Sequence, residues 1–145
     1  MPPQILPTRA FWWELSESLL DEVGLVGPNA LRLPGTVHAA EHAAIGMLPL
    51  FTICDRWDVG GVSTALHDQT GLATIFIYDA YPGGAGIAEL GYANARALLQ
   101  ETAEAIARCT CSSGCPSCVQ SPKCGNGNEP LDKSGALTLL RGAFS

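Results

Sequence analysis

The sequence predicts an α+β fold: a small β-sheet with helices packed on it, and a metal-pinned cysteine loop before a C-terminal helix. A nearly uninterrupted β-branched and aromatic run, Thr74-Ile-Phe-Ile-Tyr78, is typical of a buried central strand. Apolar residues at helical spacing follow over residues 85–108. Five of the six cysteines then fall between Cys109 and Cys124.

The first part of the chain alternates turn-forming and regular segments. Residues 1–8 are rich in proline and are expected to be a linker, so that the domain itself spans 9–145. An aromatic run over residues 9–15 favours a strand, and a helix is expected over 16–23. Residues 24–35 contain Gly-Pro-Asn and Pro-Gly, which predict a loop.

The remaining elements follow from periodicity and capping. The alanine-rich residues 38–48 predict a helix that stops before a proline, and residues 58–66 and 73–78 predict two strands. One long helix is expected over residues 85–108. Asp132 is typical of the N-cap of a final helix.

The composition suggests a chain whose surface is partly covered by another domain. It is 47% hydrophobic and only 15% charged, although a compact, glycine-rich chain is an alternative explanation. The net charge is −6, and residues 1–108 carry the excess of acidic side chains. A free-standing nucleic-acid binder usually has a basic stripe, which this sequence lacks. Any contact with nucleic acid is therefore expected to be local or shared with another domain.

The cellular compartment is predicted from the cysteines and from the apolar segments. No segment reads as a signal peptide or as a membrane span, so we expect a soluble, cytoplasmic protein with no membrane partner. In a reducing compartment, clustered cysteines indicate metal binding rather than disulfides. Cys54 stands apart and is expected to be a small buried hydrophobe.

The clustered cysteines predict one structural zinc ion. Cys115-Pro-Ser-Cys118 resembles a zinc knuckle, and Cys109 and Cys111 point to the same side of an extended segment. These four are the preferred ligands, and Cys124 is the alternative, in place of Cys109. Four protein ligands leave no open position for water, so the predicted site is structural rather than catalytic.

A second motif raises an enzymatic alternative. His38-Ala-Ala-Glu41-His42 matches the H-x-x-E-H pattern of inverted zinc proteases, in which two histidines bind zinc and the glutamate is the general base. The sequence offers no clear third ligand. We prefer the interpretation that these polar residues contact a neighbouring domain or cap the sheet.

A glycine-rich turn lies between the last predicted strand and the long helix. Gly83, Gly84 and Gly86 permit a sharp turn and close packing of the helix on the sheet, which is the structural interpretation. Amide groups at such a turn can also bind a phosphate of a nucleotide or of the DNA backbone. The sequence lacks the P-loop and G-x-G-x-x-G patterns.

Several motifs together resemble one known family. They are Asp79-Ala-Tyr-Pro-Gly-Gly-Ala-Gly-Ile-Ala-Glu89, then Cys-x-Cys-x-x-Gly-Cys-Pro-Ser-Cys-Val, then Pro122-Lys-Cys-Gly-Asn126 and Leu131-Asp-Lys133, with Glu41-His42-Ala and Cys54-Asp-Arg-Trp-Asp58-Val-Gly-Gly61 upstream. This set resembles the C-terminal zinc-binding domain of MrfA-type DEAD/DEAH-box DNA repair helicases. The resemblance covers the chain from about residue 9 to its end.

The resemblance implies a non-enzymatic module of an ATP-dependent DNA helicase. The motor domains would lie upstream in the same polypeptide and bind ATP, and DNA would be contacted in the context of the full-length protein. The module would brace the motor and help to shape the DNA path. The family's zinc ligands would correspond to Cys109, Cys111, Cys115 and Cys118. The rival functions are a zinc hydrolase using His38, Glu41 and His42, and a protein-interaction module with a structural zinc.

Overall fold

A computed structural model describes residues 8–54, 56–67, 69–81, 83–122, 124 and 127–143. In this part of the chain, three strands form one antiparallel sheet in the order β1-β3-β2. The strands are β1 (Ala10–Leu15), β2 (Val59–Thr64) and β3 (Ala73–Asp79). Five α-helices accompany the sheet, which confirms the predicted α+β class.

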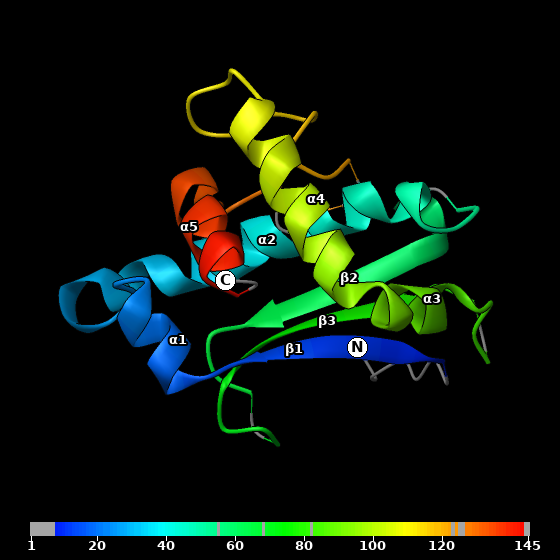
Figure 1. Ribbon diagram of the computed structural model, residues 1–145, viewed down its shortest axis with the longest axis horizontal. Helices are drawn as coiled ribbons and strands as arrows, with labels where there is room; N and C mark the ends of the chain where they lie inside the picture. Colours follow the sequence, from blue (N-terminus) through cyan, green and yellow to red (C-terminus); the bar gives the residue numbers. More distant parts are fainter. Residues whose placement is uncertain are drawn as a thin grey trace.

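Strand β3 occupies the centre of the sheet, as its apolar sequence predicted. It pairs with β1 on one side and with β2 on the other. Ile75 and Ile77 are buried, whereas Phe76 and Tyr78, which point to the opposite face, are only half-buried. Helices α2 (Leu33–Met47), α4 (Ala95–Arg108) and α5 (Lys133–Ala143) lie on one side of the sheet (Figure 1).

Helix α2 is the central helix of the domain. It packs against β2, β3, α4 and α5, so it is surrounded on most sides. Small side chains allow this close approach, and Ala39, Ala40, Ala43 and Ala44 are all buried. The same helix places two polar side chains, Glu41 and His42, inside the molecule.

The start of α2 differs from the prediction. A loop was expected over residues 24–35, but Gly27–Arg32 forms a 3₁₀ helix and α2 begins at Leu33. Pro34 lies in the first turn of α2, where a proline costs nothing because its missing N–H would have had no intrahelical partner. The Pro-Gly pair therefore begins the helix rather than forming a turn.

The long helix expected over residues 85–108 is divided in two, so that prediction was wrong. Helix α3 (Ile87–Ala93) packs on β1 and β3, and α4 follows after Asn94. The Asn94 side chain donates to the carbonyl of Leu90 at 2.8 Å and ends α3. Asparagine competes for backbone hydrogen bonds in this way, which makes it a common helix terminator.

The two capped helices were predicted correctly. Ser16 caps α1 (Glu17–Glu22) by accepting from the amide of Leu19. Asp132 caps α5 by accepting from the amide of Gly135 at 2.8 Å.

The linker expected over residues 1–8 falls outside the described residues except for Thr8. Among the described residues, no helix has the length and apolar character needed to cross a bilayer.

Candidate metal centre

The cysteine segment begins where α4 ends, at the end of the helix farthest from the sheet (Figure 1). Cys109 takes an extended conformation, with φ −73° and ψ 128°, so the chain leaves the helix as a strand-like segment. Cys115 and Cys118 lie in a tight turn, closed by a 3.0 Å bond from the Cys118 amide to the Cys115 carbonyl. Gly114 has φ +128°, a conformation that side chains disfavour, and it lets the chain enter this turn.

These local structures bring four sulfur atoms together. Cys109 Sγ lies 3.5 Å from Cys111 Sγ and 3.4 Å from Cys115 Sγ. Cys118 Sγ lies 3.5 Å from Cys111 Sγ and 3.9 Å from Cys115 Sγ. Thiolates bound tetrahedrally at about 2.3 Å to one zinc ion are about 3.8 Å apart. The observed separations therefore fit a four-thiolate zinc site.

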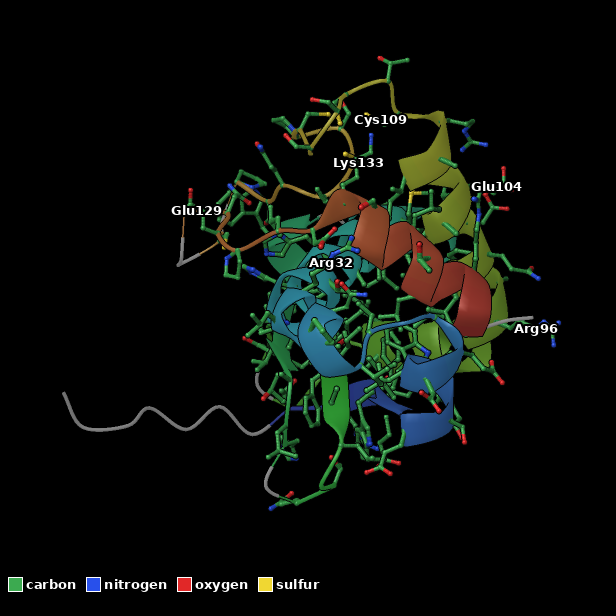
Figure 2. All side chains as sticks on the ribbon, turned by 90° about the vertical axis from the view of Figure 1, so that its left-hand side faces the viewer. Arg32, Arg96, Glu104, Cys109, Glu129 and Lys133 are labelled. Atoms are coloured by element: carbon green, nitrogen blue, oxygen red, sulfur yellow. The ribbon has the colours of Figure 1, made fainter. Side chains whose placement is uncertain are left out.

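Lys133, the first residue of α5, lies beside the cluster (Figure 2). Its ammonium group donates to the carbonyls of Cys109 at 2.9 Å and Cys111 at 2.5 Å. It also donates to Cys111 Sγ at 3.1 Å. Four thiolates around one Zn²⁺ carry a net charge of about −2, so a cation at this distance offsets part of that charge.

The environment shifts the pKa values of two thiols in opposite directions. The hydrogen bond from Lys133 lowers the pKa of Cys111 to about 6. Burial raises the pKa of Cys118 to about 12. Cys118 and the neighbouring Val119 are buried in the core beside α2 and α4, which anchors the cluster to the domain. A bound metal ion would favour the thiolate form of both residues, because thiolate is the form that binds metal.

Cys124 lies apart from the four-sulfur cluster. Its Sγ is 3.5 Å from His38 Nε2, on α2. His42 joins this pair, and each of the three residues offers a ligand atom within 4.8 Å of the other two. The fifth cysteine therefore belongs to a second group, which the sequence analysis did not predict.

The H-x-x-E-H residues lie on α2 as the helical spacing predicted. The rings of His38 and His42 are 4.2 Å apart between centroids. Glu41 is buried and lies so close to Gly61 of β2 that a Cβ on that glycine would be 2.6 Å from a carboxylate oxygen. All three residues line a cavity of about 370 Å³, together with Cys124.

The glycine-rich turn is held by a buried carboxylate. Asp79 is fully buried at the end of β3. It accepts hydrogen bonds from the amide of Ala85 and, at 2.8 Å, from that of Ala88. Gly84 and Gly86 have φ +88° and +85°, as the structural interpretation of this turn requires. These two amides are therefore satisfied within the domain rather than presented to a phosphate.

The sequence analysis did not predict the role of Lys133 or the second group of ligands, although the sequence contains an indication of each. A lysine in the first turn of a helix opposes the helix dipole, so Lys133 indicated a specific partner there. A fifth cysteine that is not needed for a four-ligand site, in a chain with two histidines one helical turn apart, indicated a second group of ligands.

The sequence matches a family model and curated proteins. Residues 40–119 match the MrfA Zn-binding domain. An uncharacterized protein of Methanocaldococcus jannaschii is 42% identical over 112 residues, which are 75% of this chain and 100% of that protein. The uncharacterized ATP-dependent helicase YprA of Bacillus subtilis is 36% identical over 82% of this chain, but the match covers only 15% of the helicase. ATP-dependent helicase HRQ1 of Saccharomyces cerevisiae is 26% identical over 96% of this chain and 14% of its own length.

The fold also matches a solved helicase structure. The crystal structure of DUF1998 helicase MrfA bound to DNA superposes with a TM-score of 0.64 and 29% identity, over 92% of this chain and 17% of the helicase. The zinc binding that gives this family its name agrees with the tight cluster of four cysteines in this chain. The domain is thus of the zinc-binding kind found in DNA helicases, and the chain belongs to the MrfA Zn-binding domain family.

Proposed function

We propose that this chain is a cytoplasmic, structural zinc module of an ATP-dependent DNA helicase that acts in DNA repair. The convergence of Cys109, Cys111, Cys115 and Cys118 on one point carries the zinc part of the proposal. In this assignment Cys124 is not a ligand of that zinc, because its Sγ faces His38 instead. The four protein ligands would fix the loop between α4 and α5 without a catalytic role.

The helicase part of the proposal is supported by the relatives. The chain spans about 15% of the YprA helicase, so an ATP-dependent motor would have to lie outside this domain. The MrfA structure that it resembles is bound to DNA. We therefore place the module on a motor of the same polypeptide, with DNA as a partner of the assembled helicase.

The outer face of the sheet is the surface that suits contact with the motor. Phe76 pairs with Trp12 on β1 and with Val62 on β2, so the three side chains form a row across the sheet. Trp12 is 50% exposed and Val62 is 52% exposed, on the face opposite to the packed helices. A contiguous exposed apolar row of this kind marks an interaction surface. Coverage of this row by the motor would account for the apolar surplus of the sequence.

Elemental analysis tests the zinc assignment. The wild-type chain and its Cys109→Ser, Cys111→Ser, Cys115→Ser and Cys118→Ser variants would be purified without added metal. Each variant is expected to lose the zinc of the four-cysteine site, and with it part of its resistance to thermal unfolding. Cys54→Ser is the matched control, since Cys54 is partly buried and packs against a different core cluster. Retention of full zinc in all four variants would refute the assignment.

A strand-separation assay tests the helicase role. In the polypeptide that carries this domain, Trp12→Glu is expected to reduce ATP-dependent DNA unwinding while the zinc content stays unchanged. Leu31→Glu, the same kind of change at a 90% exposed position outside the sheet, is the control. Unwinding that is unaffected by Trp12→Glu would exclude this face as the motor contact. Absence of any DNA crosslink to the domain would favour a pure protein-interaction module.

A further inference from the structure

We propose that His38, His42 and Cys124 form a second zinc site, separate from the four-cysteine cluster. Two groups of metal-ligating side chains are present in the described part of the chain, and these three residues are the second. Two belong to the central helix α2, and the third comes from the segment between α4 and α5. The site thus joins Cys124 to two histidines that precede it by 82 and 86 positions in the sequence.

The spacing of the ligand atoms fits zinc. An imidazole nitrogen at about 2.05 Å and a thiolate at about 2.3 Å from one tetrahedral ion are about 3.6 Å apart. His38 Nε2 and Cys124 Sγ are 3.5 Å apart. The third ligand atom, from His42, lies within 4.8 Å of both. Small adjustments of the side chains would bring all three onto one ion.

Both histidines are oriented as metal ligands usually are. His38 Nδ1 lies 2.8 Å from the carbonyl oxygen of Pro130, and His42 Nδ1 lies 2.8 Å from that of Val119. A carbonyl oxygen only accepts, so each Nδ1 carries the proton and donates it. The lone pair of each ring is then on Nε2, which is the nitrogen that faces Cys124 in His38. Such a donation to a backbone carbonyl fixes the tautomer and orientation of zinc-bound histidines.

The two carbonyls belong to residues on either side of Cys124 in the sequence. Val119 precedes Cys124 in the chain and Pro130 follows it. The histidines therefore hold the segment on both sides of Cys124 by hydrogen bonds, and the metal would hold it at Cys124 itself. Its contribution to the fold would be to fasten this segment, which has few buried apolar residues, onto α2.

Three protein ligands leave the fourth position of a tetrahedral ion open. The three residues line the cavity of about 370 Å³, together with Glu41, Ser63 and Thr64. Water from this cavity would complete the coordination. This open position distinguishes the second site from the four-cysteine site, where every ligand is a protein thiolate.

Zinc stoichiometry tests the proposal. Purified wild-type chain, dialysed against buffer with excess zinc and then against metal-free buffer, is expected to hold two zinc ions per chain. Cys124→Ser and His38→Gln are expected to hold one. His67→Gln is the matched control and should keep two, because His67 lies at the outer face of the sheet against Phe76. Far-UV circular dichroism of each variant verifies that it remains folded.

Cobalt substitution identifies which site is lost. Cys124→Ser should remove the Co²⁺ bound by one thiolate and two imidazoles, and should leave the intense sulfur-to-cobalt bands of the four-thiolate site unchanged. One zinc per wild-type chain that survives Cys124→Ser would overturn the second site and leave the proposed function intact. One zinc that is lost with Cys124→Ser and kept in Cys111→Ser would overturn the four-cysteine assignment instead.

Discussion

Replacement of Lys133 by methionine tests how the protein stabilises the four-thiolate site. Methionine has an unbranched side chain that extends as far as Cε, so the change removes the ammonium group and keeps most of the reach of the side chain. That group makes three hydrogen bonds, to the carbonyls of Cys109 and Cys111 and to Cys111 Sγ. Both the charge beside the thiolates and the positions of two ligand residues therefore depend on it.

The expected loss of zinc affinity is about 10- to 100-fold, which is the usual effect of removing a group that supports metal ligands. The upper part of this range applies, because one ammonium reaches a ligand sulfur and the backbone of two ligand residues. The stability of the metal-free domain should not fall, because the loss of the charge has a compensating effect on α5. Without its charge, the first residue of α5 no longer opposes the helix dipole.

Competition against a chromogenic chelator measures this affinity directly. The background should be Cys124→Ser, so that the four-cysteine site is observed alone. Arg141→Met is the matched control, since it removes one positive charge from the last turn of the same helix. If Lys133→Met weakens zinc binding no more than Arg141→Met does, the ammonium group does not support the site.

Two further changes test the fold. Arg32 donates to Asp132 at 2.6 Å and lowers the pKa of that carboxyl, whose value in unfolded chains is about 3.9. The contact therefore stabilises the fold above about pH 4 and is lost as the pH falls through the folded pKa. Asn caps helices as well as Asp does, so Asp132→Asn should lower the urea midpoint at neutral pH. Its effect should become smaller as the pH falls below about 4. An effect that does not change with pH would contradict this. Leu98→Ala, at a fully buried position, should lower the free energy of unfolding by about 2–5 kcal/mol in urea titrations. Leu31→Ala, at a 90% exposed position, is its control, and equal effects would show that Leu98 is not a core residue.

Much of the fold was predictable because local signals and burial agree. The apolar run of β3 places it at the centre of the sheet, and Ser16 and Asp132 cap the helices that follow them. The errors occur where tertiary packing decides. The break at Asn94 is needed because α3 packs on the sheet and α4 packs on α2 and α5. A helical periodicity cannot reveal that two consecutive segments have different packing partners.

The candidate metal centre was predictable in part for a similar reason. The ligand set of Cys109, Cys111, Cys115 and Cys118 lies within ten consecutive residues, so spacing alone indicates it. The group of His38, His42 and Cys124 depends on how the segment after Val119 folds back against α2. That contact spans most of the chain, and no local pattern encodes it. Only the fifth cysteine and the two histidines one helical turn apart indicated a second group of ligands.

Val119 links the two groups of ligands. Its side chain is fully buried next to Cys118, and its carbonyl accepts from His42 Nδ1. Zinc in the four-cysteine cluster would fix Cys118 and so help to hold the Val119 carbonyl in the position that orients His42. Because linkage is reciprocal, zinc at either group should strengthen binding at the other by the same factor. The segment between α4 and α5 buries only Cys118, Val119 and Ser121 among its described residues, so apolar packing contributes little to its order. Two coupled metal ions, rather than a hydrophobic core, would then determine the shape of this end of the domain.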